Sequence, residues 1–170
     1  MSHSTTYPLP PLADAVVLVV DATAGVGRRI ATQLCAAGAA VAVVGAGHPG
    51  RADDAATNAA FLCKELADIG LVALPYQVDT ERAETFRALP GQIAADLGTA
   101  TACVVVIPAG DAAESLPAAM RVVAGAVAAA LPPSATYVEV EAVEDMEGQE
   151  RLVQEVMGRL AARNSSRPRC

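Results

Sequence analysis

The amino-acid sequence predicts an α/β fold: a doubly wound parallel sheet of about five strands, in the order 3-2-1-4-5, with helices on both faces. Short valine-rich apolar runs alternate with longer alanine-rich segments of helical spacing. Most of the short runs are apolar throughout, which is typical of parallel strands buried on both faces. Right-handed crossovers then favour the stated strand order. With 170 residues, the chain has the length of one such domain.

The first half of the chain contains three strand patterns and two helix patterns. A run of five apolar residues predicts the first strand, and the glycines that follow it open the first helix. A second apolar run, a loop rich in glycine and proline, and a second helical pattern come next, and a third strand follows. The expected strands are 16–20, 40–44 and 71–78, and the expected helices are 25–37 and 53–68.

The second half continues the alternation. The dipeptide Pro90-Gly91 lies inside the third helical pattern and is expected to kink or split it. A fully apolar fourth strand, an alanine-rich helix that ends before two prolines, an alternating fifth strand and an amphipathic helix follow. The expected helices are 81–97, 112–131 and 147–163, and the expected strands are 103–107 and 136–140. Residues 14–163 thus form the domain, between a flexible N-terminal segment (1–13) and a basic C-terminal tail (164–170).

Composition and charge exclude several classes of function. The net charge of −7 repels phosphate backbones, so no nucleic-acid partner is expected. Apolar runs stay below the roughly 18 residues that span a bilayer, and the polar, proline-rich start is unlike a signal peptide, so we expect no membrane association and a cytoplasmic location. The cysteines are widely spaced, which predicts neither a disulfide framework nor a metal site. They are Cys35, Cys63, Cys103 and Cys170.

The turn between the first strand and the first helix is the most informative segment. Gly25 and Gly27 stand where the backbone of such a turn can approach a pyrophosphate, which the free N–H groups of the helix start then bind. The alternative is that these glycines only permit tight packing of the helix on the strand. This turn, residues 20–27, resembles the TGxxxGxG loop of the short-chain dehydrogenases/reductases, with Asp21 in the place of the first glycine.

The resemblance extends along most of the chain. Asp79 closes the third strand as the aspartate of the family's DV motif does, and residues 104–110 resemble its NAG stretch, with Pro108 replacing the asparagine. The resemblance implies a Rossmann-like NAD(P)-binding domain. It places the dinucleotide over Thr23, Gly25, Val26 and Gly27, the adenine near Asp79 and the ribose near Ala109 and Gly110. Asp79 could instead cap the following helix.

The loop after the second strand decides cofactor type in this family, where an acid binds the ribose of NAD and a base the extra phosphate of NADP. Here no acid follows the strand directly, and Arg51 is the nearest charge. This favours NADP over NAD, although the loop is equally consistent with an ordinary glycine- and proline-rich turn.

The family's catalytic residues have no counterpart here. Its reductases use a tyrosine with a lysine four residues later, and a serine that orients the carbonyl. The only lysine is Lys64, and none of the three tyrosines is followed by lysine at that spacing. If the last helix is aligned with the family's active-site helix, Met146 and Glu150 occupy the tyrosine and lysine positions. No catalytic residue is therefore assigned. The acidic cluster between Glu139 and Glu147 could act as a base or bind a cation, but such clusters are usually solvated surface.

Three functions remain open. The first is a non-catalytic or auxiliary dehydrogenase-like subunit that binds NADP or NAD and forms a homo-oligomer, or a hetero-oligomer with a complete homologue, through helices 112–131 and 147–163. The second is an active NAD(P)-dependent oxidoreductase with other acid–base residues; residues 23–29 and 108–117 also resemble the NADP domain of methylene-tetrahydromethanopterin dehydrogenases. The third is an interaction module without a nucleotide.

Overall fold

The computed structural model describes residues 9–51, 53–110 and 114–168. Their five strands form one sheet in the order β3-β2-β1-β4-β5, and all four pairs of neighbouring strands are parallel. The predicted fold class and strand order are confirmed. The strands are β1 (Val16–Val20), β2 (Ala40–Gly47), β3 (Ala73–Asp79), β4 (Ala102–Ile107) and β5 (Thr136–Glu141).

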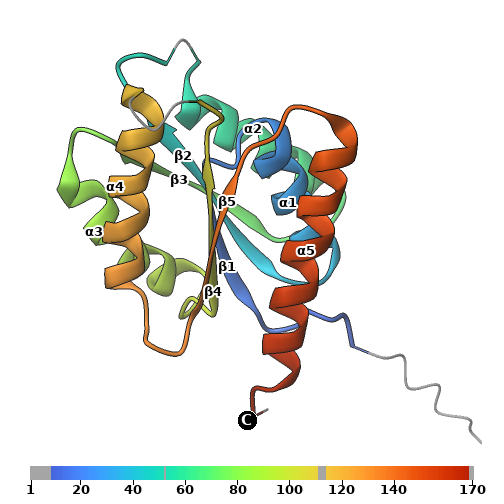
Figure 1. Ribbon diagram of the computed structural model, residues 1–170. Helices are drawn as coiled ribbons and strands as arrows, with labels where there is room; N and C mark the ends of the chain where they lie inside the picture. Colours follow the sequence, from blue (N-terminus) through green and yellow to red (C-terminus); the bar gives the residue numbers. More distant parts are fainter. Residues whose placement is uncertain (1–8, 52, 111–113, 169–170) are drawn as a thin grey trace, which may run out of the picture.

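Helices cover both faces of the sheet (Figure 1). One core lies between the sheet and helices α1, α2 and α5; a second lies between the opposite face and helices α3 and α4. The helices are α1 (Gly25–Ala36), α2 (Ala55–Asp68), α3 (Ala83–Asp96), α4 (Ser115–Ala130) and α5 (Met146–Ser165). This division follows from the right-handed crossovers, which place α1 and α2 on one face and α3 and α4 on the other.

Strand β1 shows why the central runs are apolar at every position. Val17 and Val19 pack in the core with α1, whereas Leu18 and Val20 pack in the core with α3 and α4. Successive side chains of a strand point to opposite faces, so a strand covered on both sides needs no polar position. At the edge, β5 alternates instead: Val138 and Val140 are buried, and Glu139 and Glu141 are exposed.

The structure shifts several predicted boundaries. Strand β2 runs three residues beyond the predicted end, to Gly47, because its last residues pair with the end of β3. Helix α2 begins at Ala55, since Asp54 accepts hydrogen bonds from the N–H groups of Ala56 and Thr57 and so caps it. The predicted split at Pro90 is wrong: α3 is one helix, anchored around the proline by buried Phe86, Leu89 and Ile93. Part of the predicted 112–131 helix lies outside the described residues.

The first and last described segments of the chain meet the rest of the domain at the amino edge of the sheet. Leu12, within the segment predicted to be flexible, is only 1% exposed and belongs to the core. Asn164, in the predicted tail, donates to the carbonyl of Pro11, and Arg167 donates to the carbonyls of Thr101 and Ser134. Among the residues that the structure describes, no helix is long and apolar enough to cross a membrane.

Candidate functional site

The residues predicted to form the site gather at the carboxyl edge of the sheet. Asp21 directly follows β1, Arg51 lies in the loop after β2, and Asp79 ends β3. The pair Ala109-Gly110 comes two residues after β4. Parallel strands all end at the same edge, and β1 and β4 are the neighbours at which the chain direction across the sheet reverses. Ligands of open α/β sheets bind at this switch point.

The start of α1 is open. Gly25 has φ of +54°, and a Cβ added to it would meet no atom within 4 Å. The N-cap residue Ala24 supplies no side-chain hydrogen bond, and the first turn carries no acid. The first N–H groups of a helix have no partner within the helix, so those of Gly25, Val26 and Gly27 stay available to an anion.

The two glycines of the turn have different roles. A Cβ on Gly27 would lie 2.4 Å from the carbonyl oxygen of Asp21, so any side chain there would push α1 away from β1. Gly27 is therefore needed for the tight packing of α1 on β1, which was the alternative role considered for these glycines. Gly25 faces no such contact, and its positive φ is the backbone conformation that favours glycine.

Thr23 and Val26 are buried beside this opening. Thr23 is 7% exposed, and its hydroxyl has no hydrogen-bond partner among the described residues. A buried hydroxyl without a partner is costly, so a nearby acceptor would stabilise it. The side chain of Val26 is 2% exposed and belongs to the core, which leaves only its backbone N–H for binding.

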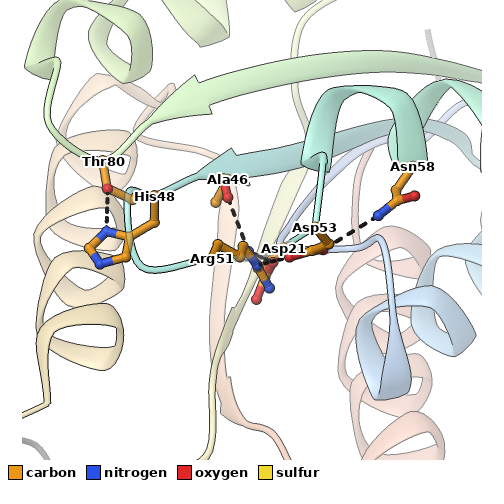
Figure 2. A network of polar contacts seen from close by, with 7 residues as sticks. All are labelled: Asp21, Ala46, His48, Arg51, Asp53, Asn58 and Thr80. Carbon is orange, nitrogen blue, oxygen red and sulfur yellow. Dashed lines mark hydrogen bonds and ion pairs between the residues drawn. The ribbon is translucent and has the colours of Figure 1, made fainter.

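An ion-pair cluster occupies the space between the ends of β1 and β2 (Figure 2). The Nη1 atom of Arg51 lies 2.6 Å from Oδ1 of Asp21 and 3.0 Å from the carbonyl oxygen of Ala46. Its Nε atom lies 3.0 Å from Oδ1 of Asp53. The side chains of Arg51 and Asp21 are 16% and 8% exposed. Burial opposes the charge on Arg51, but the hydrogen bonds and charges of Asp21 and Asp53 outweigh it and raise the pKa of the guanidinium.

This cluster changes what Arg51 can recognise. One guanidinium faces two carboxylates, so the group carries a net charge of one negative unit. Recognition of a 2′-phosphate would need Arg51 as a free cation, and its guanidinium is instead paired with Asp21 and Asp53. Asp21 also adopts φ of +65°, a left-handed conformation that explains why this position suits glycine.

Asp79 and His48 hold the loops beside this ion-pair cluster. The Asp79 carboxylate accepts a hydrogen bond from the N–H of Glu81 at 2.9 Å, which closes a turn before α3. The N-cap of α3 is Arg82, so Asp79 does not cap the helix itself. His48 shares hydrogen bonds with the hydroxyls of Thr80 (2.8 Å) and Ser115 (3.4 Å) and so links the β2–α2 loop to the start of α4.

Gly110 lies close to Glu114. A Cβ on Gly110, whose φ is +150°, would lie 2.5 Å from Oε2 of Glu114. Ala109 and Gly110 are both exposed at the edge of the sheet. Their backbone therefore remains accessible, and the carboxylate of Glu114 lies beside it.

The described tyrosines have the opposite electrostatics of a catalytic phenol. Tyr76 donates to Asp96 at 2.7 Å and Tyr137 donates to Glu139 at 3.0 Å. Burial, followed by the hydrogen bond and charge of the neighbouring carboxylate, raises the pKa of both phenols. A catalytic tyrosine needs a lowered pKa, so neither is prepared for proton transfer.

The two positions aligned with the family's catalytic pair have structural roles or face solvent. Met146 is 70% exposed at the start of α5. Glu150 accepts a hydrogen bond from Arg29 of α1 at 2.6 Å and thereby ties α5 to α1. Lys64 pairs with Asp68 on the same helix. No tyrosine–lysine pair is assembled from the described residues.

The side chains of the acidic cluster between Glu139 and Glu147 have separate structural partners. Asp145 caps α5 through the N–H of Gly148, and Glu141 lies 3.5 Å from Arg121 of α4. Within the described ranges, no three His, Cys, Asp or Glu side chains are placed to hold a metal ion together. Cys35, Cys63 and Cys103 are buried free thiols.

Comparison with solved structures identifies the architecture. A hydroxysteroid dehydrogenase from Escherichia coli aligns over 92% of this chain and 70% of its own, with a TM-score of 0.64 and 17% identity. The fold is that of the short-chain dehydrogenases/reductases. A short-chain type dehydrogenase/reductase from Mycobacterium marinum (TM-score 0.52, 25% identity) covers 72% of this chain. A dehydrogenase/reductase from Sinorhizobium meliloti 1021 (TM-score 0.57, 20% identity) covers 75%.

The chain spans about half the length of the latter two proteins, 50% and 54% respectively. No protein-family model matches the sequence, and no curated protein does. The likeness therefore concerns the fold.

The sequence pattern points to Asp21 and Arg51 separately but not to their ion pair or to the contact of Arg51 with Asp53. A signal was present: Asp21 ends β1, and Arg51 belongs to the loop that follows the neighbouring β2. Opposite charges at adjacent carboxyl ends are expected to meet. The bridge from His48 to Ser115 had no such signal, because the two residues come from elements that are distant in the chain.

Proposed function

We propose that this chain is a non-catalytic, short-chain dehydrogenase-like protein that binds NAD(H) at the carboxyl edge of its sheet and serves as an auxiliary subunit. The observation that carries the proposal is the open start of α1, where no side chain caps the helix and Gly25 faces free space. A pyrophosphate is the group that such a turn accommodates.

The residues present fit the parts of a dinucleotide. The N–H groups of Gly25, Val26 and Gly27 would hold the pyrophosphate, and the hydroxyl of Thr23 would gain a partner. Asp79 would lie near the adenine, and Ala109 and Gly110 near the nicotinamide-side ribose. When bound, NAD would supply a hydride acceptor, and these residues would hold and orient it.

The preference for NAD(H) over NADP(H) follows from the Arg51 cluster. Its net negative charge repels a 2′-phosphate, whereas carboxylates accept hydrogen bonds from the hydroxyls of an unmodified ribose. Asp21, from the β1 turn, and Asp53, from the β2–α2 loop, take the part that an acid directly after β2 plays elsewhere.

The proposed lack of catalysis rests on the tyrosines. Both described phenols are bonded to carboxylates, and the only lysine pairs within α2. A second candidate function, an interaction module without a nucleotide, is favoured by one observation: the Asp21–Arg51 pair is largely buried and satisfies itself without a ligand.

Calorimetric titration of the purified protein with NADH and NADPH tests the proposal. We expect NADH to bind more tightly than NADPH and no turnover with a panel of carbonyl substrates. Absence of binding by either dinucleotide would support the interaction module, and tighter NADPH binding would refute the role given to the Arg51 cluster. Robust carbonyl reduction by the protein alone would refute the lack of catalysis.

The variant Ala24→Glu sharpens the test. Ala24 is exposed at the N-cap of α1, so a carboxylate there repels a pyrophosphate without steric conflict and is compatible with the helix start. We expect NADH affinity to fall about threefold to tenfold, since a surface charge contributes about 1 kcal/mol. The matched control, Ala24→Gln, should keep its affinity. Equal binding by both variants would place the nucleotide elsewhere.

A further inference from the structure

The two edges of the sheet differ in their capacity to accept another strand. On β3, the N–H of Thr80 donates to the carbonyl of Gly47 on β2, so residues of even number on β3 point their backbone groups inward. Pro75 therefore lies at an outward-facing position and has no N–H to offer. Proline at such a position is a usual protection against edge-to-edge pairing.

The β5 edge has no such protection. Thr136 and Ala142 donate to the carbonyls of Thr101 and Ile107, so the even-numbered residues of β5 point toward β4. By alternation along the strand, Tyr137, Glu139 and Glu141 present their N–H and C=O groups at the free edge. In the described part of the chain, no strand lies beyond β5.

The charges beside this edge are arranged with opposite signs at its two ends. A hollow of about 750 Å³ lies at the amino end, between residues 133–137 and the last turns of α5, where its lining includes Arg159, Arg163 and Arg167. At the carboxyl end, five exposed side chains are acidic. They are Glu139, Glu141, Glu144, Asp145 and Glu147.

We propose that two copies of this chain pair through their β5 edges in antiparallel orientation and form one continuous sheet. A two-fold axis perpendicular to the sheet places the acidic end of each β5 edge at the basic end of the other. It also sets the two α5 helices antiparallel on one face, with the acidic start of each toward the basic end of its counterpart. A parallel arrangement would bring like charges together, so the charge pattern selects a second copy in this orientation.

The backbone alternation also restricts the register. Hydrogen-bonded pairs must join outward-facing residues, so Tyr137 of one copy pairs with Glu139 of the other, and Val138 faces Val138 at the axis. Moving the axis by one residue toward the carboxyl end would place Glu139 opposite Glu139, a pair of like charges that is disfavoured. In the preferred register, the Tyr137 hydroxyl meets a carboxylate from the second copy, the same kind of partner that it has within its own chain.

Sedimentation velocity of the full chain at tens of micromolar tests the pairing. We expect a species with twice the monomer mass of 17.2 kDa. Glu139→Pro removes an outward N–H and none of the bonds to β4, so it should yield a monomer. Gln77→Pro, at an outward position of the protected β3 edge, is the matched control and should remain a dimer. Circular dichroism confirms that each variant is folded.

A cysteine scan tests the register and does not depend on the proline variant. In a Cys170→Ser background, Val138→Cys should form a disulfide-linked dimer under mild oxidation, because facing Cβ atoms of a non-hydrogen-bonded pair lie about 5 Å apart. Val140→Cys should not. The proposal would be overturned by a monomeric wild type, or by a folded Glu139→Pro variant that is still a dimer. Cross-linking through residue 140 in place of residue 138, or pairing of β5 with a strand of another protein, would also overturn it.

Discussion

Replacement of Asp21 separates the two features that this residue combines, a buried charge and a left-handed backbone. Its carboxylate accepts from Arg51 at 2.6 Å, and its φ is +65°. Hydrogen bonds to charged groups contribute about 1.5–3 kcal/mol, and the left-handed conformation costs a residue with a Cβ about 1–2 kcal/mol. Asp and Asn tolerate this conformation better than Ala does.

Of three variants at this position, the alanine variant should therefore be the least stable. Asp21→Ala loses the ion pair and increases the backbone strain, so its unfolding free energy should fall by about 3–4 kcal/mol. Asp21→Gly loses the pair but relieves the strain, for a net loss of about 1–2 kcal/mol. Asp21→Asn keeps an acceptor and the tolerant backbone and should also lose about 1–2 kcal/mol. Arg51 retains Asp53 and the Ala46 carbonyl, so none reaches the cost of a fully orphaned buried charge.

Urea unfolding followed by circular dichroism measures these differences, and thermal melts should shift by about 2–4 °C per kcal/mol. The difference between the alanine and glycine variants isolates the backbone contribution. Equal stability of these two would refute the strain argument. An asparagine variant as stable as the wild type would show that the charge of Asp21 does not stabilise Arg51.

Three further outcomes are expected. Gly27→Ala should lower stability by about 1–3 kcal/mol through overpacking against Asp21, so a loss of NADH binding in a Gly27 variant counts only if its fold is intact; unchanged stability would contradict the 2.4 Å approach. Leu12→Ala should lower the free energy of unfolding in urea by about 2–4 kcal/mol, because this side chain belongs to the core. A loss below about 0.5 kcal/mol, the size typical of surface substitutions, would contradict this. Burial raises the pKa of Cys63 to about 11 and of Cys35 to about 12. In the unfolded chain the thiols ionise at about pH 8.5. Their contribution to the free energy of unfolding is therefore complete below that pH and falls as the pH rises toward 11. Modification of these thiols in the folded protein by a thiol reagent at pH 8 would contradict their burial.

The sequence alone determined the architecture. Wholly apolar runs such as residues 16–20 require burial on both faces, and their alternation with helical segments leaves few topologies other than the doubly wound parallel sheet. It also placed the glycine turn, Asp79 and the Ala109-Gly110 pair at one edge, because parallel strands end together. The absence of a tyrosine–lysine spacing is likewise a property of the sequence.

The tertiary structure decided what those residues do. The sequence does not distinguish Gly25 from Gly27. Only the structure shows that Gly27 packs against the carbonyl of Asp21, whereas Gly25 faces open space. The sequence alone suggests that Arg51 is a free cation, whereas the structure shows that it pairs with Asp21 and Asp53. The continuity of α3 through Pro90 depends on its buried neighbours, and the asymmetry of the two sheet edges depends on which way each backbone group points. Helix and strand formation follow local patterns, whereas these contacts join residues far apart in the chain, and a local pattern carries no information about such distances.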